Sequence, residues 1–124
     1  MKIVMLDANV VIDYIRHTND ALERLQPYNG YKLAVSFLVY TEVMAGAQPR
    51  HKAQTEKIFN YFPVMPYSTK AQLLARVLAR KYHVSHPMDL LIASHAIDLD
   101  TPFLTNNMRD FTRYKELQVL HYKI

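Results

Sequence analysis

The sequence predicts an α/β fold, a three-layer α/β/α sandwich around a central, mainly parallel sheet. Short apolar runs of strand type alternate along the chain with segments whose apolar residues recur at helical spacing. A helix between successive strands returns the chain in the same direction, so such strands pair in parallel with helices on both faces. At 124 residues, half of them hydrophobic, the chain can bury one core and is too short for two. We therefore expect a single domain over residues 1–124.

The first half of the chain begins with the clearest strand. The run from Lys2 to Leu6 is almost wholly apolar and ends at Asp7, a pattern typical of a buried parallel strand. Asp7 begins a helix, because apolar residues recur after it at helical spacing. The next elements are a helical stretch from Ala21 to Leu25 that ends before Pro27, a strand over 33–35, and a helix capped by Ser36 that runs to Gly46.

The second half continues the alternation and contains the longer predicted helices. The expected elements are a helical segment over 51–61, a short extended segment over 63–66, a helix capped by Ser68 or Thr69, a second helix from Met88 to Leu99, and strands over 101–105 and 118–122. The two long helices are separated at His86 and Pro87, because the residue before a proline disfavours helical backbone.

Composition excludes several kinds of site. The chain has no cysteine, which excludes disulfides, thiolate zinc sites, iron–sulfur clusters and cysteine nucleophiles, so a catalytic metal must be bound by oxygen or imidazole. Fifteen Lys and Arg against eleven Asp and Glu leave a charge of +4, which favours polyanionic partners such as nucleic acid. No apolar run approaches the roughly 18 residues of a membrane span, and we expect a cytoplasmic protein without a membrane partner.

Several carboxylates stand where structural roles do not fully account for them. Glu42 interrupts an otherwise apolar helix, and Asp7 and Asp89 also adjoin apolar runs. Helix capping is an alternative for Asp7, Asp89 and Asp110, and a basic partner is the alternative for Glu42. Since unpaired buried carboxylates repel one another and are costly, a shared divalent cation explains the group more simply. The carboxyl ends of parallel strands share one edge, so Asp7 is expected at the same rim as Asn106, Asn107 and Asp110.

Four segments carry a specific resemblance. Residues 6–10, 41–46, 87–96 and 104–111 resemble the four ordered motifs of PIN domains, especially those of VapC toxins from bacterial and archaeal type II toxin–antitoxin pairs. The likeness extends over essentially the whole chain. It implies a PIN-like sandwich and a Mg²⁺-dependent endoribonuclease, with Mn²⁺ as a possible substitute. It also implies RNA as substrate, a cognate antitoxin and a homodimer.

The resemblance also implies which residues form the site. Asp7, Glu42 and Asp89 match the three central acidic residues of the family and are expected as catalytic metal ligands. Family members often have an acidic residue at the place of Asn107 and another three positions later, so we take Asp110 as the fourth acid and Asn107 as a supporting amide. Two further positions, Asn9 and Thr105, match supporting polar residues of the motifs.

Hydrolysis by an activated water is the mechanism that this site implies. Asp7 and Asp89 would be the principal ligands, while Glu42 would hold or deprotonate the attacking water, leaving a 5′-phosphate and a 3′-hydroxyl. Attack by the ribose 2′-hydroxyl would instead rely on histidines. The six histidines are scattered, however, and only His83 and His86 lie close in sequence. We interpret these as surface residues and His95, on an apolar helical stripe, as a core residue.

Three rival functions remain as alternatives. A phosphatase with an aspartate nucleophile would have a second aspartate at the position of Asn9. A nucleotide-binding module would need a glycine-rich loop, and neither Gly30 nor Gly46 belongs to one. A catalytically silent PIN-like domain that binds RNA or protein is the non-enzymatic alternative, and the intact acidic residues argue against it.

Overall fold

The structure is a computed structural model that describes residues 2–122; residues 1, 123 and 124 of the predicted domain lie outside the described residues. A sheet of five parallel strands has the spatial order β3-β2-β1-β4-β5. The strands are β1 (Ile3–Leu6), β2 (Lys32–Ser36), β3 (Val64–Met65), β4 (Phe103–Thr105) and β5 (Val119–His121). The helices are α1 (Ala8–Arg16), α2 (Ala21–Leu25), α3 (Phe37–Gly46), α4 (Lys52–Lys57), α5 (Thr69–Lys81), α6 (Pro87–Asp98) and α7 (Met108–Phe111).

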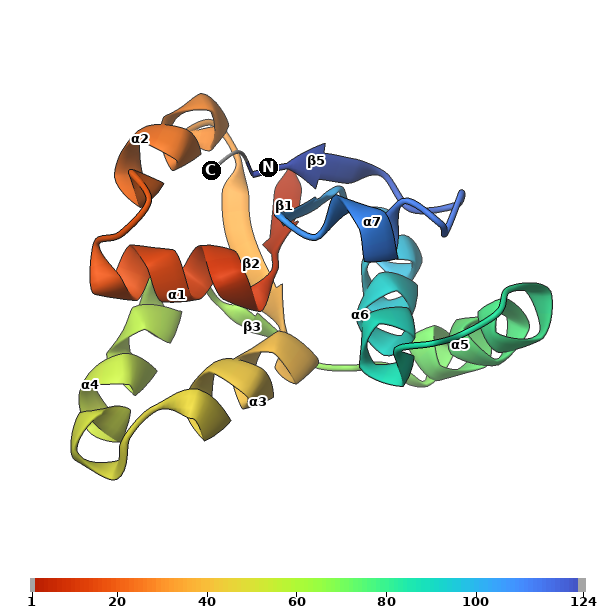
Figure 1. The fold of residues 1–124 in the computed structure, drawn as a ribbon, viewed down its shortest axis with the longest axis horizontal. Helices are drawn as coiled ribbons and strands as arrows, with labels where there is room; N and C mark the ends of the chain where they lie inside the picture. The colour runs from red at the N-terminus through yellow and green to blue at the C-terminus, as the bar shows by residue number, and fades with distance from the viewer. Residues whose placement is uncertain (1, 123–124) are drawn as a thin grey trace.

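The helices lie on both faces of the sheet, as the sequence predicted. Figure 1 shows α1, α2 and α4 on one side of the strands and α5, α6 and α7 on the other. This division follows from the strand order: the chain moves outward from β1 to β3, then crosses back to β4 beside β1. Right-handed crossovers in opposite directions place their helices on opposite faces. The predicted α/β/α sandwich is therefore confirmed.

The core fills the space between these layers. Val4, Met5 and Leu6 of β1 are at most 1% exposed, because neighbouring strands and both helical layers cover this central strand. Such burial on both faces accounts for the nearly continuous apolar run that predicted the strand. Among the helices of the described chain, none is long and apolar enough to cross a membrane.

The strand order also determines where a site can form. The chain connections reverse direction between the neighbouring strands β1 and β4, which pair in parallel with Leu6 opposite Leu104. Beyond the carboxyl ends of such strands the connecting segments diverge to opposite faces and leave room for a ligand. Asp7 directly follows β1, and Thr105 is the last residue of β4.

Two predicted segments differ from the structure in extent. The helical segment expected over 51–61 is only α4, with 3-10 turns at Pro49–His51 and Ile58–Asn60 on either side. The extended segment over 63–66 pairs with β2 through only two residues, Val64 and Met65. Pattern alone does not separate an α-helix from tight 3-10 turns, because both bring apolar residues to one side at three-residue spacing.

Candidate active site

Asp7 lies between β1 and α1 and is held in a fixed orientation. It is the N-cap of α1, and its Oδ1 accepts a hydrogen bond from the Ala8 amide at 2.8 Å. The Thr105 hydroxyl donates to Asp7 Oδ2 at 2.6 Å, and thus joins the ends of β1 and β4. The residue is only 8% exposed. Burial raises the pKa of the Asp7 carboxyl; the two hydrogen bonds oppose this rise, while the nearby charge of Asp89 adds to it.

Glu42 lies on α3, and the expectation that it is buried was wrong. The side chain is exposed, although its neighbours along the helix are apolar, because the buried face of α3 consists of Val39 and Val43. Partial desolvation nevertheless raises the pKa of Glu42, and the charges of Asp7 and Asp89 raise it further. Within residues 2–122, no Lys or Arg lies within ion-pair distance of Glu42. The carboxylate therefore faces other carboxylates without a basic partner.

Asp89 is in the first turn of α6, where a carboxylate suits the helix dipole. It is partly buried, and desolvation raises its pKa; the charge of Asp110 adds to this rise, while those of His86 and Arg113 reduce it. Asp89 also affects the pKa values of Asp7 and Glu42. Asp89 is therefore the residue that electrostatically connects Asp7 and Glu42 with Asp110.

Asp110 is surrounded by donors, unlike Glu42. The side-chain amide of Asn107 donates to Asp110 Oδ2 at 2.9 Å, and Arg113 Nη2 lies 3.8 Å from Asp110 Oδ1. His86 Nδ1 is 3.9 Å from Oδ2. The cap of the short helix α7 is Asn107 rather than Asp110, which corrects the capping alternative for Asp110.

One set of side chains is packed closely enough to share an ion. Ligand atoms of His86, Asp89 and Asp110, which we call the outer cluster, all lie within 4.8 Å of one another. In the described residues, Asp7 and Glu42 are not part of this close set. We call these two residues the inner carboxylates. The structure thus brings the four predicted acids into one electrostatic group but does not place them around one point.

Sequence reasoning missed His86 and Arg113 as members of the site. His86 was interpreted as a surface histidine, and its side chain is indeed 61% exposed. The signal that could have identified it is its spacing, three positions before Asp89 across a helix start. Asn107 and Asp110 show the same spacing at the start of α7.

The predicted supporting residues are all near the rim. Thr105 is fully buried, and its hydroxyl accepts a hydrogen bond from the Asn107 amide N–H at 2.9 Å while donating to Asp7. Asn9 is at the second position of α1, and its Oδ1 is buried without a partner in the described part of the chain, as is Oδ1 of Asn106. Asn9 follows Asp7 by two residues and Asn106 directly follows Thr105, so these buried oxygens without donors fit a rim that takes up a cation and its hydration water.

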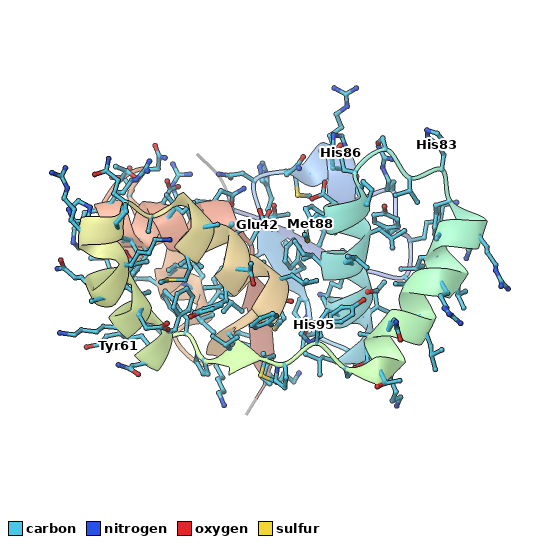
Figure 2. All side chains as sticks on the ribbon, turned by 90° about the horizontal axis from the view of Figure 1, so that it is seen from below. Glu42, Tyr61, His83, His86, Met88 and His95 are labelled. Carbon is cyan, nitrogen blue, oxygen red and sulfur yellow. The ribbon has the colours of Figure 1, made fainter. Side chains whose placement is uncertain are left out.

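A buried histidine holds together the helices that carry Glu42 and Asp89. His95 is completely buried, which confirms its interpretation as a core residue, and its Nδ1 lies 2.7 Å from the hydroxyl of Ser36. Ser36 caps α3 by accepting from the Leu38 amide. Burial lowers the pKa of His95, which favours a neutral ring. Figure 2 shows Glu42 on α3 beside the start of α6, which packs against α3 and carries Met88 and His86.

Comparisons with known proteins agree with this fold. A family model described as the PIN domain matches residues 4–117. Ribonuclease VapC19 of Mycobacterium tuberculosis is 32% identical over 92% of this chain and 96% of its own, and the tRNA(fMet)-specific endonuclease VapC of Salmonella typhimurium is 27% identical over 93% and 94%. The crystal structure of DNA-bound VapBC from Salmonella typhimurium aligns with a TM-score of 0.83 at 26% identity, over 99% of this chain and all of the other. On this evidence the chain belongs to the PIN domain family.

Proposed function

We propose that this protein is a metal-dependent endoribonuclease and the toxin of a toxin–antitoxin pair. The observation that carries the proposal is the group of carboxylates beyond β1 and β4, three of which have a raised pKa, in a chain of the PIN family. Relatives that align over nearly the full chain are named ribonucleases and a tRNA(fMet)-specific endonuclease. This agreement supports an enzyme over the catalytically silent alternative.

The donor set fits a hard divalent cation. Asp7, Glu42, Asp89 and Asp110 would hold it, and carboxylate oxygens are the ligands that Mg²⁺ prefers; Mn²⁺ accepts the same donors. Desolvation, with mutual repulsion as the smaller cause, raises the pKa of the first three residues, and a bound cation would offset their negative charge. When bound, the ion would supply acidification of the attacking water and neutralisation of charge on the phosphate.

The residues of the chain have distinct tasks in the proposed hydrolysis. Thr105 and the Ala8 amide orient Asp7, so that its carboxylate is preorganised before RNA binds. Glu42 is exposed and has a raised pKa, which suits a group that accepts a proton from the attacking water. Asn9 and Asn107 support the rim. The products would carry a 5′-phosphate and a 3′-hydroxyl.

Partners follow from the same proposal. Solved structures that align with this chain include VapBC complexes, so we propose a cognate antitoxin as partner. RNA is the proposed substrate, and the exposed Arg109, next to Asp110 on α7, places positive charge beside the rim. The homodimer, the cytoplasmic location and a single domain over the whole chain stay predictions.

The test is cleavage of an end-labelled structured RNA with Mg²⁺, Mn²⁺ or a chelator. Wild type is compared with Asp7→Asn, Asp89→Asn and the control Asp100→Asn. Asp100 is exposed beyond the far end of α6 and has a φ of 53°, which asparagine tolerates well. We expect metal-dependent cutting with 5′-phosphate ends in the wild type and the control, and cutting slowed by at least about 10²–10³-fold in the other two variants. Cutting that resists the chelator, or that keeps the wild-type rate in Asp7→Asn and Asp89→Asn, would contradict the proposal.

A further inference from the structure

The outer cluster contains a nitrogen donor among carboxylates. His86 extends from the start of α6 with its side chain 61% exposed, and its Nδ1 lies 3.9 Å from Asp110 Oδ2. This separation is longer than a hydrogen bond, while one ring nitrogen and one oxygen each of Asp89 and Asp110 all lie within 4.8 Å. A single ion with bonds of about 2.0–2.2 Å to nitrogen and oxygen joins ligand atoms up to about 4.4 Å apart, so small side-chain movements bring these three atoms within its reach.

Local sequence explains why these three side chains meet. His86 is the N-cap of α6 and is held in extended backbone by Pro87, while its carbonyl accepts from the Asp89 amide at 3.1 Å. The three-residue spacing brings the side chains of His86 and Asp89 to the same side of the helix start. Asp110 is in the first turn of α7, which packs against α6. The cluster is therefore made by two helix starts that contact each other.

The charge balance of the outer cluster differs from that of the inner carboxylates. Arg113 Nη2 lies 3.8 Å from Asp110 and already offsets part of the negative charge. A neutral imidazole adds a lone pair without adding negative charge, so it strengthens coordination by donor type rather than by attraction. Imidazole is bound most strongly by the later transition metals; Mn²⁺ favours oxygen donors but takes a nitrogen ligand more readily than Mg²⁺, which prefers oxygen and retains several waters.

We propose that His86, Asp89 and Asp110 form a mixed nitrogen–oxygen cation subsite in which a ring nitrogen of His86 is a direct ligand, and that this nitrogen makes the site favour Mn²⁺ over Mg²⁺. This inference rests on the proposed function, because Asp89 belongs both to this subsite and to the proposed catalytic group. The competing explanation is a simple ion pair between protonated His86 and Asp110, in which no metal contacts the ring.

The two explanations differ in a spectroscopic signature. Mn²⁺ bound directly to imidazole shows a ¹⁴N coupling by electron spin echo envelope modulation, and an ion pair does not. The full chain would be loaded with Mn²⁺ alone and compared with His86→Gln and with the matched control His83→Gln. His83 is also exposed and lies three residues away, but in the described chain it is outside the close set; Figure 2 shows it farther out, beyond the end of α5.

We expect the ¹⁴N coupling in the wild type and in His83→Gln and its loss in His86→Gln. Titration calorimetry should show Mn²⁺ affinity reduced at least about tenfold in His86→Gln, since altering even the partners that surround metal ligands costs about 10–100-fold. The affinity for Mg²⁺ should change much less. Because the side chain is exposed, the metal-free variant should melt like the wild type by circular dichroism.

The outcomes separate this inference from the proposed function. If the wild type binds Mn²⁺ and cuts RNA, but the ¹⁴N coupling is absent or persists in His86→Gln, the subsite is overturned and the proposed nuclease stands. Equal loss of Mg²⁺ and Mn²⁺ affinity would overturn the selectivity. If the wild type binds no Mn²⁺ and cutting resists the chelator, both proposals fail.

Discussion

Asp7 and Asp110 follow neighbouring strands, yet they differ in burial and in the groups that surround their carboxylates. Asp7 is 8% exposed and receives two neutral hydrogen bonds, and burial raises its pKa. Asp110 has a side chain that is 21% exposed and lies near the guanidinium of Arg113, the ring of His86 and the amide of Asn107. The inner carboxylates thus retain an uncompensated charge, whereas the protein itself offsets part of the outer one.

This difference predicts separate contributions of the inner carboxylates and the outer cluster to metal binding. A carboxylate whose charge is offset by arginine gains less from an added cation than one without a basic partner. The inner carboxylates should therefore contribute most of the electrostatic attraction, and the outer cluster most of the selectivity through its donor types. Instability of the metal-free inner side is the expected cost, as at other sites where function opposes stability.

The largest expected effect is on catalysis. Asp7→Asn should reduce RNA cleavage by at least about 10²–10³-fold, the range for loss of one group that stabilises transition-state charge. Asp110→Asn should reduce it less, by about tenfold, because Arg113 already offsets part of the charge that this ligand contributes to the site. Single-turnover rates at saturating Mg²⁺ measure both. Equal losses in the two variants would break the comparison between the inner and outer sides.

Thr105→Val should produce the largest loss of stability. The hydroxyl donates to Asp7 and accepts from the backbone N–H of Asn107. Its removal leaves these two groups at a buried position without partners. The expected loss in free energy of unfolding is about 1–3 kcal/mol by urea denaturation. Thr112→Val is the matched control, because the exposed hydroxyl of Thr112 donates only to the Met108 carbonyl of its own helix. A loss no larger than that of the control would show that this hydroxyl does not hold the inner side together.

In the metal-free protein, neutralising an inner carboxylate should affect stability differently from neutralising Asp110 of the outer cluster. The pKa of Asp7 in the folded, metal-free protein is raised above its ordinary value of 3.8, so the folded state binds the proton more tightly than the unfolded chain. Wild-type stability should therefore fall as pH rises from about 4 through the raised pKa, and Asp7→Asn should show a smaller fall, to which only the raised pKa values of Glu42 and Asp89 still contribute. Melting in chelator at pH 7 should show a higher Tm for Asp7→Asn and no gain for Asp110→Asn. A lower Tm for Asp7→Asn would mean that its hydrogen bonds outweigh desolvation.

The smallest effect concerns a compensated carboxylate away from the site. Glu116 accepts two hydrogen bonds, from Lys81 Nζ at 2.8 Å and from the Tyr82 hydroxyl at 2.7 Å. These bonds lower the pKa of Glu116 from 4.5 to about 2. The stabilisation is present above pH 4.5 and is lost as pH falls toward 2, the direction opposite to that of Asp7. Glu116→Gln should lack this acid-side loss, and the difference in Tm should be small because the pair is exposed. Melting curves between pH 2 and 6 test it, and a dependence of the same sign as that of Asp7 would contradict the comparison.

The sequence by itself determined the alternating elements, the parallel sheet and the places of Asp7, Asp89 and Asn107 at the ends and starts of those elements. These features depend on short-range physics: apolar periodicity, capping side chains and the effect of proline on its neighbour. The same physics placed His95 in the core. The family resemblance then selected the acidic residues from among other charged positions.

Only the tertiary structure decided how these residues face one another. The Thr105–Asp7 bond joins residues 98 positions apart, and the Ser36–His95 contact joins residues 59 apart. The exposure of Glu42 depends on which side of α3 faces the sheet, which an apolar helix does not encode because every side is apolar. The proximity of His86 and Asp110 also depends on tertiary packing. It arises where α6 contacts α7, and the spacing of residues along either helix does not determine that contact.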